Sequence, residues 1–399
     1  MAGLLKGVKV VEMAVLLTGD YVGSLLGDEG AEVIKIESPP VGDYIRSYMG
    51  ELKPNWSAAH LFVNRNKRSL SLNLRAPEGQ EVLHRLLKDA DVFVTGNVGE
   101  TPRKLKVDYE TLSKLKPDII YCHATGFGTE GPLATLPSHG QMMDAIVGGT
   151  PTSQGKDGLL HLDKTQVTAT SRATGGTFIG PIFAAFGVAA ALVRRAKTGQ
   201  GAYLDVSCSD SVLAAQWVMV NKDLNIDRIQ ASEVPSPGPD TADYNYYRAK
   251  DGKGIVFCAQ EPRFWENFCK SVKRPDLLDA KKRIGNGIEL RRVIQGILEK
   301  ETQAYWTDLF VANNVAAGPV VDIKDVDKLP HTQARGIIQE YNHPVAGPFK
   351  MVTNPIKVRG EQFELKYQAP SVGQHTDEVL KELGYTPDQI ASLRKKGAV

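Results

Sequence analysis

The residues best suited to chemistry form a basic run and a glycine-rich loop. Residues 64–68, with the sequence NRNKR, place three cations before an expected strand, where they could hold phosphate groups. A solvated charge run is the alternative interpretation. Residues 125–132, TGFGTEGP, have glycines spaced for a tight loop whose amides can approach a ligand. This spacing matches neither the dinucleotide fingerprint nor a P-loop, so a purely structural turn remains the alternative.

Isolated acids and one histidine are candidates for acid–base catalysis. His139 begins a helical stretch and could act as a base, or it could cap the helix or lie in the core. Asp144 and Asp163 are carboxylates whose burial the sequence leaves open. Glu261 follows an expected strand and could serve as an acid or base, or favour the start of the next helix. No Gly-x-Ser-x-Gly motif is present, which disfavours a serine hydrolase.

Composition narrows the class of protein. The chain has 399 residues with 42% hydrophobic and 24% charged residues, which is enough for two globular domains. A net charge of +2 gives no support for a nucleic-acid partner. None of the four cysteines lies in a Cys-x-x-Cys pair, so we expect neither a metal site nor a disulfide framework. We find no signal peptide and no membrane span, and we therefore expect a cytoplasmic protein without a membrane partner.

Strand-like and helical segments alternate along the first half of the chain. We expect strands at residues 7–13, 31–36, 69–74, 90–95, 119–124 and 203–207, and helices at residues 21–28, 77–89, 109–115 and 178–195. This alternation with short loops predicts an α/β fold built on a doubly wound parallel sheet. Residues 233–240 are the best linker candidate, followed by a hairpin at residues 246–260 and by helices to about residue 310. Two helices, at residues 376–383 and 387–396, close the chain.

Taken in order, these segments resemble family III CoA-transferases, the group that contains formyl-CoA and carnitine CoA-transferases. The matching motifs lie at residues 5–10, 30–37, 42–43, 66–74, 126–128, 197–201, 317–320, 373–376 and 383–385. The resemblance implies a large Rossmann-like domain made from both termini, which we place at residues 1–225 plus 325–399. It also implies a smaller α/β domain, at residues 226–324, and two subunits interlocked like chain links.

The chemistry implied by the resemblance needs one aspartate, which begins the long apolar helix. Its carboxylate attacks the acyl-CoA thioester and forms a mixed anhydride. Counting back from Thr198-Gly199 places Thr177 at this position. A threonine hydroxyl is not ionised near neutral pH and cannot form an anhydride. Asp163 would have to be displaced by 14 residues to serve instead, so the resemblance identifies no catalytic residue in this chain.

The resemblance also implies CoA contacts, and several of its expected positions are altered. The predicted CoA-binding residues are Leu72, Asn73, Arg75 and Lys104, with weaker predictions for Lys67 and Arg68. Relatives often have arginine where this chain has Ser38, and proline where it has Asp20, which adds a negative charge close to the expected CoA. The loop at residues 95–100 also departs from the family pattern. We therefore expect weakened CoA binding as well as lost catalysis.

The favoured hypothesis is a non-catalytic subunit of a heteromeric CoA-transferase, with a homologous catalytic subunit that carries the aspartate. Such an enzyme moves CoA between carboxylic acids, for example from succinyl-CoA to benzylsuccinate in anaerobic aromatic degradation. The CoA thioester is then the substrate, and no cofactor or metal is expected. The alternatives are an α-methylacyl-CoA racemase-like isomerase that uses His139 and Glu261, a CoA-binding protein without activity, and a transferase with an unconventional nucleophile.

Overall fold

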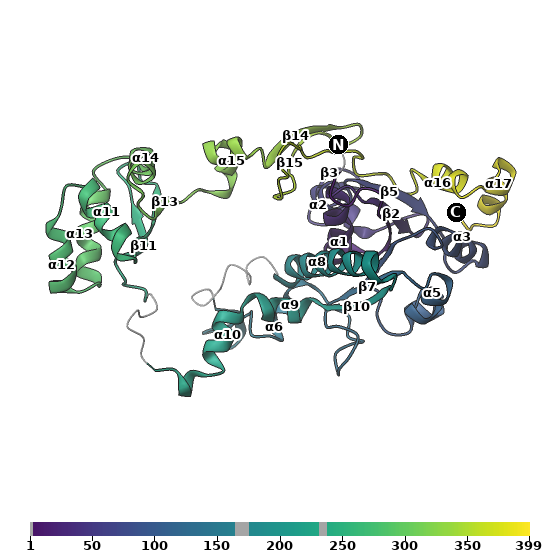
Figure 1. Cartoon of the computed structure of the whole chain (residues 1–399), viewed down its shortest axis with the longest axis horizontal. Helices are drawn as coiled ribbons and strands as arrows, with labels where there is room; N and C mark the ends of the chain where they lie inside the picture. Colours follow the sequence, from purple (N-terminus) through teal and green to yellow (C-terminus); the bar gives the residue numbers. More distant parts are fainter. Residues whose placement is uncertain (1–2, 164–174, 231–237) are drawn as a thin grey trace. The chain divides into compact units, whose positions relative to one another are not determined.

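In the computed structural model of the protein, six parallel strands form one sheet in the order β10-β7-β6-β1-β2-β5 (Figure 1). They are β1 (Lys9–Met13), β2 (Glu32–Glu37), β5 (Lys67–Ser71), β6 (Val92–Thr95), β7 (Ile120–Thr125) and β10 (Ala202–Ser207). In register, Val10 of β1 lies beside Val33 on one side and Val92 on the other. The predicted parallel sheet is thus confirmed, although β5 lies two residues earlier than the expected strand at its start and ends at Ser71.

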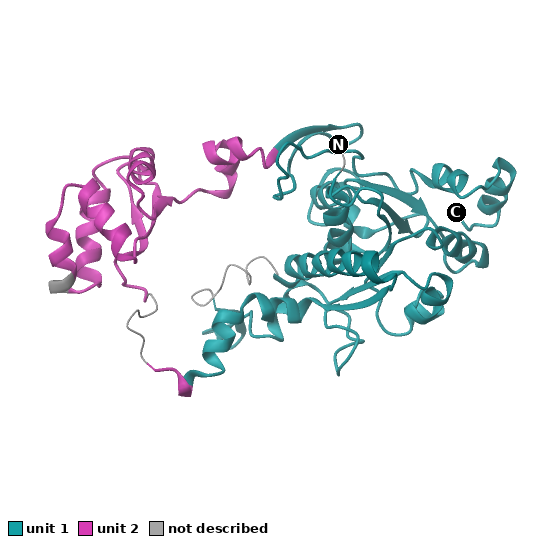
Figure 2. Ribbon diagram, viewed as in Figure 1, with its two compact units in different colours: residues 1–226, 339–399 teal, residues 227–338 magenta. Residues whose placement is uncertain are grey.

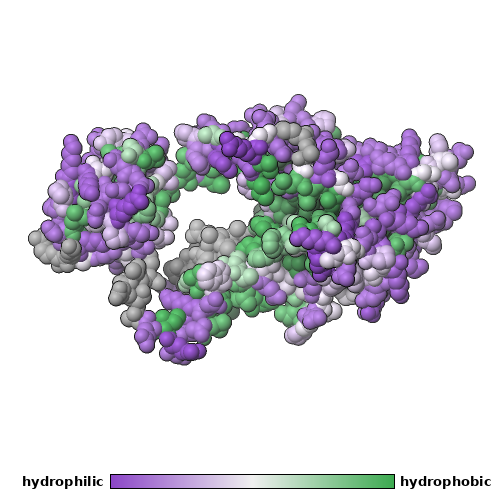
Figure 3. All heavy atoms as spheres, in the orientation of Figure 1, coloured by the Kyte–Doolittle hydropathy of each residue, from purple (hydrophilic) through white to green (hydrophobic). Residues whose placement is uncertain are grey.

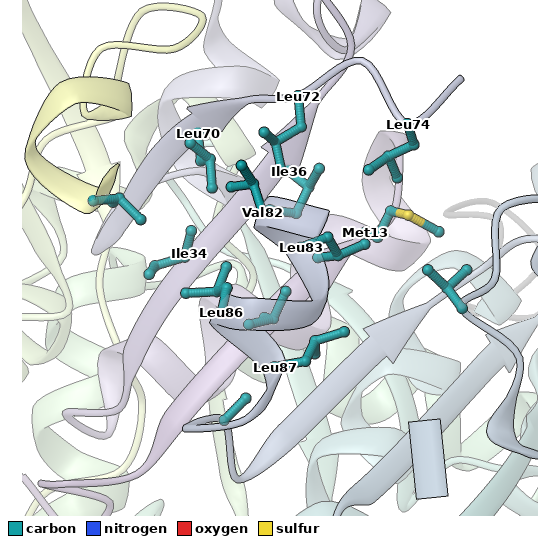
Figure 4. Close-up of a cluster of buried hydrophobic side chains, with 14 of the residues drawn as sticks. Met13, Ile34, Ile36, Leu70, Leu72, Leu74, Val82, Leu83, Leu86 and Leu87 are labelled. Atoms are coloured by element: carbon teal, nitrogen blue, oxygen red, sulfur yellow. The ribbon is translucent and has the colours of Figure 1, made fainter. Parts of the chain in front are cut away.

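Helices cover both faces of this sheet. The helices α1 (Leu16–Asp28) and α8 (Gly175–Thr198) pack on one face. The other face is covered by α3 (Pro77–Leu87), α5 (Tyr109–Leu115), α16 (Thr376–Glu382) and α17 (Pro387–Lys395). Successive side chains of a strand point to opposite faces, so Val10 joins the core under α1 and α8, and Val11 joins the core under α3. Figure 4 shows Leu83, Leu86 and Leu87 of α3 in one cluster with strand residues such as Ile34 and Ile36.

The helix α8 is the longest in the described part of the chain, and it is long and apolar enough to cross a membrane by those two criteria alone. In this fold one face of the helix packs on the sheet, with Ala184, Val188 and Ala191 buried against the strands. It ends before Gly199, whose φ of +70° is the left-handed conformation that commonly terminates helices. The expected helix at residues 178–195 is therefore confirmed and extended at both ends.

The structure describes residues 3–163, 175–230 and 238–399, without the side chains of residues 282–284. It separates into unit 1, Met1–Ile226 with Gln339–Val399, and unit 2, Asp227–Ile338 (Figure 2). The C-terminal segment thus joins unit 1 at residue 339, whereas we expected residue 325. Most of the predicted linker at residues 233–240 falls outside the described residues.

Unit 2 is a three-stranded antiparallel sheet packed against helices. The strands are β11 (Tyr244–Arg248), β12 (Gly254–Cys258) and β13 (Ala317–Pro319). The helices are α11 (Pro262–Ser271), α12 (Asp276–Ile284), α13 (Ile288–Leu298) and α14 (Gln303–Asn313). The aromatic side chains of Phe257, Phe268 and Phe310 form the centre of its core.

The remaining elements are short. Three hairpins are formed by β3 (Glu51–Lys53) with β4 (Trp56–Ser57), by β8 (Thr152–Gln154) with β9 (Leu160–Leu162), and by β14 (Ile338–His343) with β15 (Gly347–Val352). The short helices of unit 1 are α2 (Ala58–Val63), α4 (Thr101–Lys104), α6 (Gly140–Ala145), α9 (Cys208–Ala215) and α10 (Trp217–Asp223). Short 3-10 helices lie at Tyr44–Ser47, Ile226–Arg228 and Ile323–Lys328, and α15 (Pro330–Arg335) precedes β14.

Candidate functional site

The strand order reverses between β1 and β6, which places the candidate ligand site at the carboxyl ends of these strands. From β1 the chain adds β2 and β5 on one side, then returns to place β6 on the other. In open α/β sheets, ligands bind outside the carboxyl ends of the strands at such a switch point. The loops at residues 14–16, 96–100 and 126–132 follow β1, β6 and β7 at this edge.

His123, which the sequence did not single out, fixes the loop after β6. Its Nε2 lies 2.5 Å from the carbonyl oxygen of Asn97, and its Nδ1 lies 3.1 Å from the hydroxyl of Tyr203. Burial lowers the pKa of His123. The hydroxyl of Thr95 also accepts a hydrogen bond from the Asn97 side chain at 3.0 Å. The loop at residues 95–100 is therefore anchored at its base.

Thr177 lies in the first turn of α8, at the same edge of the sheet. It is buried, with 5% of its surface exposed. A Cβ at the neighbouring Gly176 would lie 2.7 Å from the Cβ of Met143, so α6 approaches α8 too closely for a side chain there. A Cβ at Gly180 would collide with the thiol of Cys208, which follows β10. Small residues therefore let α6 and α9 pack around the start of α8.

Asp144 is a buried carboxylate beside this helix terminus. It lies on α6 with 1% of its surface exposed, and neither of its oxygens has a hydrogen-bond partner of good geometry in the described part of the chain. Burial raises the pKa of Asp144, and the backbone amides of Gly176 and Gly175 act in the opposite direction. The sequence had left the burial of this carboxylate open. The structure brings it to the residues that precede Thr177.

Two of the predicted CoA-binding cations are engaged inside the protein. Lys67 is completely buried, and its Nζ lies 2.7 and 3.0 Å from the two carboxylate oxygens of Glu12. Arg68 donates to Glu378 at 2.8 Å and to Glu382 at 2.7 Å. The basic run at residues 64–68 is therefore not a solvated charge run, and its Lys67 has no exposed atom with which to reach a phosphate.

The other predicted CoA-binding residues follow the carboxyl ends of β5 and β6. Arg75 and Lys104 are exposed, and within residues 3–163, 175–230 and 238–399 neither forms an ion pair. Leu72 is fully buried in the core. Asn73 donates from its side chain to the carbonyl of Gly397 at 3.0 Å and accepts from the Arg75 amide at 3.1 Å. Arg75 and Lys104 are thus the cations of the predicted set that remain available to a ligand.

Asp20 does not present the negative charge that we expected near a ligand. It is completely buried on α1, and its carboxylate forms an ion pair with Lys35 of β2. Lys35 also pairs with Asp43 at 2.9 Å and lies 3.9 Å from Glu12. Burial lowers the pKa of Lys35, but these carboxylates outweigh that effect and raise it. The expectation was wrong because the cation that neutralises Asp20 comes from a neighbouring strand.

The same buried network continues to His60. Its ring nitrogens lie 3.0 Å from Arg46 Nη1 and from Asn64 Nδ2. Burial, helped by the positive charge of Arg46, lowers the pKa of His60 to about 3, so the ring is neutral at physiological pH. Arg46 in turn forms a bidentate pair with Glu37, in which Nε donates to Oε1 at 3.1 Å and Nη2 donates to Oε2 at 2.7 Å. The buried network therefore holds the loops that follow β1 and β2 in place.

The remaining candidate residues belong to different elements of the two units. His139 is exposed at the start of α6 in unit 1, and Glu261 is exposed at the start of α11 in unit 2. Asp163 is half-buried after β9, and its amide donates to the carbonyl of Pro151 at 2.8 Å. Ser38 is exposed directly after β2. Within unit 1, the structure brings none of His139, Asp163 and Ser38 into a described cluster with Thr177.

Comparison with known proteins agrees with the resemblance. A sequence model described as CoA-transferase family III matches residues 5–376. The chain is 31% identical to succinyl-CoA:glutarate CoA-transferase of Mus musculus over 99% of this chain and 90% of the relative. It is 26% identical to the beta subunit of succinyl-CoA–L-malate CoA-transferase of Chloroflexus aurantiacus over 99% and 98% of the two chains. A CAIB/BAIF family protein from Brucella suis has a similar crystal structure, with a TM-score of 0.74, 25% identity and coverage of 96% and 100%.

Proposed function

The chain belongs to CoA-transferase family III, and we propose that it is the non-catalytic subunit of a heteromeric enzyme that moves CoA between carboxylic acids. The observation that carries the proposal is Thr177 in the first turn of α8, where the family chemistry needs an aspartate. A homologous subunit then supplies the nucleophile. The beta-subunit name of the Chloroflexus aurantiacus relative supports the view that this family includes assemblies of more than one kind of chain.

The reaction explains why threonine cannot substitute. A carboxylate oxygen attacks the thioester carbonyl, the carbon–sulfur bond breaks, and CoA leaves as the thiolate. The resulting anhydride accepts the returning thiolate and releases the donor acid. Thr177 has a neutral hydroxyl, and an ester formed on it would not transfer its acyl group to a carboxylate. No carboxylate lies in the described first turn of α8.

The outer face of α8 supports the need for a partner. Figure 3 shows apolar residues gathered over this helix. Its exposed apolar side chains are Phe178, Ile182, Phe183, Phe186 and Val193, and Phe186 has 71% of its surface exposed. A contiguous exposed apolar face of this kind marks an interaction surface in a globular protein. We propose that the homologous subunit covers it, as two interlocked subunits would.

For the substrates we propose succinyl-CoA as the donor and a dicarboxylic acid such as benzylsuccinate as the acceptor. The names of both relatives reported above include succinyl-CoA. The assembly would work in the cytoplasm with the CoA thioester itself as substrate and without a further cofactor. Arg75 and Lys104 would contribute the exposed cations for the CoA phosphates.

Purification of the affinity-tagged chain from its native host tests the proposal. We expect a second family III chain to co-elute in equal amount, and we expect CoA-transferase activity only in the complex. A control preparation of the chain expressed alone should lack activity. A tagged chain that elutes as an active assembly of identical subunits would contradict the proposal.

A further inference from the structure

The start of α8 is a site for a negative charge, and a side chain of this chain already lies in it. The described part of this helix begins at Gly175, and the N-terminal end of a helix carries partial positive charge. The carboxylate of Asp144 is buried beside Gly175 and Gly176; burial raises its pKa, and the amides of these two glycines oppose that rise. Both oxygens of Asp144 lack another partner in the part of the chain that the structure describes.

Packing explains how α6 delivers this carboxylate. Met143, the neighbour of Asp144, lies in a small apolar cluster with Phe127 and Cys208. The glycine at position 176 lets α6 approach α8 closely, and a Cβ at Gly149 would lie 3.0 Å from the carbonyl oxygen of Asp144. Gly176 is therefore needed for the close approach of α6, and Gly149 leaves room beside the backbone of Asp144.

We infer that Asp144 fills the anion site at the N-terminus of α8 with a carboxylate presented from α6, and that a small carboxylate ligand enters this site when Asp144 is shortened. The inference rests on the proposed function in one respect, the absence of a nucleophile at residue 177. In this chain the carboxylate at the start of α8 belongs to a neighbouring helix, so the site is closed by the chain itself.

A consequence follows for any attempt to restore the nucleophile. Thr177→Asp alone would place a second carboxylate at the same helix terminus, and two like charges at one site disfavour the ionised form that attacks the thioester. Thr177→Asp combined with Asp144→Asn removes the competing charge and keeps the size of the side chain. In this double variant, the new carboxylate would attack the thioester carbon and release CoA thiolate.

The first test measures carboxylate binding to Asp144→Gly. We expect its melting temperature to rise with the concentration of formate or acetate, and sodium chloride at equal ionic strength to have no such effect. Asp144→Asn is the matched control, because its amide fills the site, and it should show no shift. A Gly variant that responds to acetate no more than the Asn variant would overturn the inference.

The second test remains informative if the glycine variant does not fold. Intact-mass analysis after incubation with acyl-CoA and hydroxylamine should find at least tenfold more covalent product on the Thr177→Asp/Asp144→Asn double variant than on Thr177→Asp. Equal labelling of the two variants would refute the inference and leave the proposed function intact. Labelling of the unsubstituted chain at Asp144 would instead refute the proposed function.

Discussion

The substitution Lys67→Met tests whether Lys67 stabilises the fold or binds CoA. Methionine keeps most of the apolar stem of lysine but removes its charge. In the folded chain Glu12 then loses its nearest described cation, which lies 2.7 Å away, and keeps Lys35 at 3.9 Å. The backbone carbonyl of Asp20 also loses the hydrogen bond that Lys67 donates at 2.6 Å. The substitution therefore leaves a buried carboxylate without its close partner.

The size of the effect follows from this burial. Removing one partner of a buried ion pair costs about 3–5 kcal/mol, because the other charge stays in the protein interior. Neutralising both residues in Glu12→Gln/Lys67→Met removes that penalty and leaves the lost hydrogen bond to Asp20, worth about 1 kcal/mol. The double variant should thus be more stable than the single one, which is a coupling that a double-mutant cycle measures.

Urea denaturation followed by circular dichroism measures these stabilities, and calorimetric titration with CoA measures binding to the same samples. Lys104→Met is the matched control, because Lys104 is exposed and should change stability by less than about 0.5 kcal/mol. If Lys67→Met kept its stability and lost affinity for CoA, the assignment of Lys67 to the buried network would be refuted.

Three further predictions concern the pH response, the partner and the ligand. His60 has a pKa lowered to about 3 in the fold and a value near 6.5 when unfolded, so its contribution to stability is complete above pH 6.5 and falls as the pH drops toward 3. At pH 5 about 2 kcal/mol should be lost, and urea titrations of His60→Gln should lack this component of the slope. Phe186→Asp should abolish co-purification of the partner while circular dichroism stays unchanged, because Phe186 is exposed in the isolated chain. The double variant Arg75→Ala/Lys104→Ala should weaken CoA binding by calorimetry about tenfold, whereas unchanged binding would exclude these cations from the site.

Much of the fold was predictable because strands that are covered on both faces have nearly continuous apolar sequences. The segment VIKI in β2 shows where such prediction ends. Lys35 interrupts the run and must be buried if the strand is central, but its partners Asp20 and Asp43 are identified only once α1 and the following loop are placed. Lys67 and Glu12 lie 55 residues apart, and no local pattern links them. The basic run at residues 64–68 therefore looks like a ligand site in the sequence.

In the candidate site, too, the sequence predicts some features, and others depend on how distant elements pack. The position of Thr177 follows from counting along an unbroken helix to the turn at Gly199, which the structure confirms as a helix end. The burial of Asp144 depends on how α6 packs against α8, which no periodicity in a six-residue helix reveals. Gly176 is a local indication of this packing, because a glycine there permits the close approach of α6 to α8.

The most direct test of the central claim is to map the covalent intermediate in the purified complex. The complex is incubated with the acyl-CoA donor, trapped with hydroxylamine, and digested for mass spectrometry of both chains. We predict that the partner chain carries the modification on the aspartate at the start of its long apolar helix, and that every acidic residue of this chain is unmodified. A modified carboxylate on this chain would contradict the account.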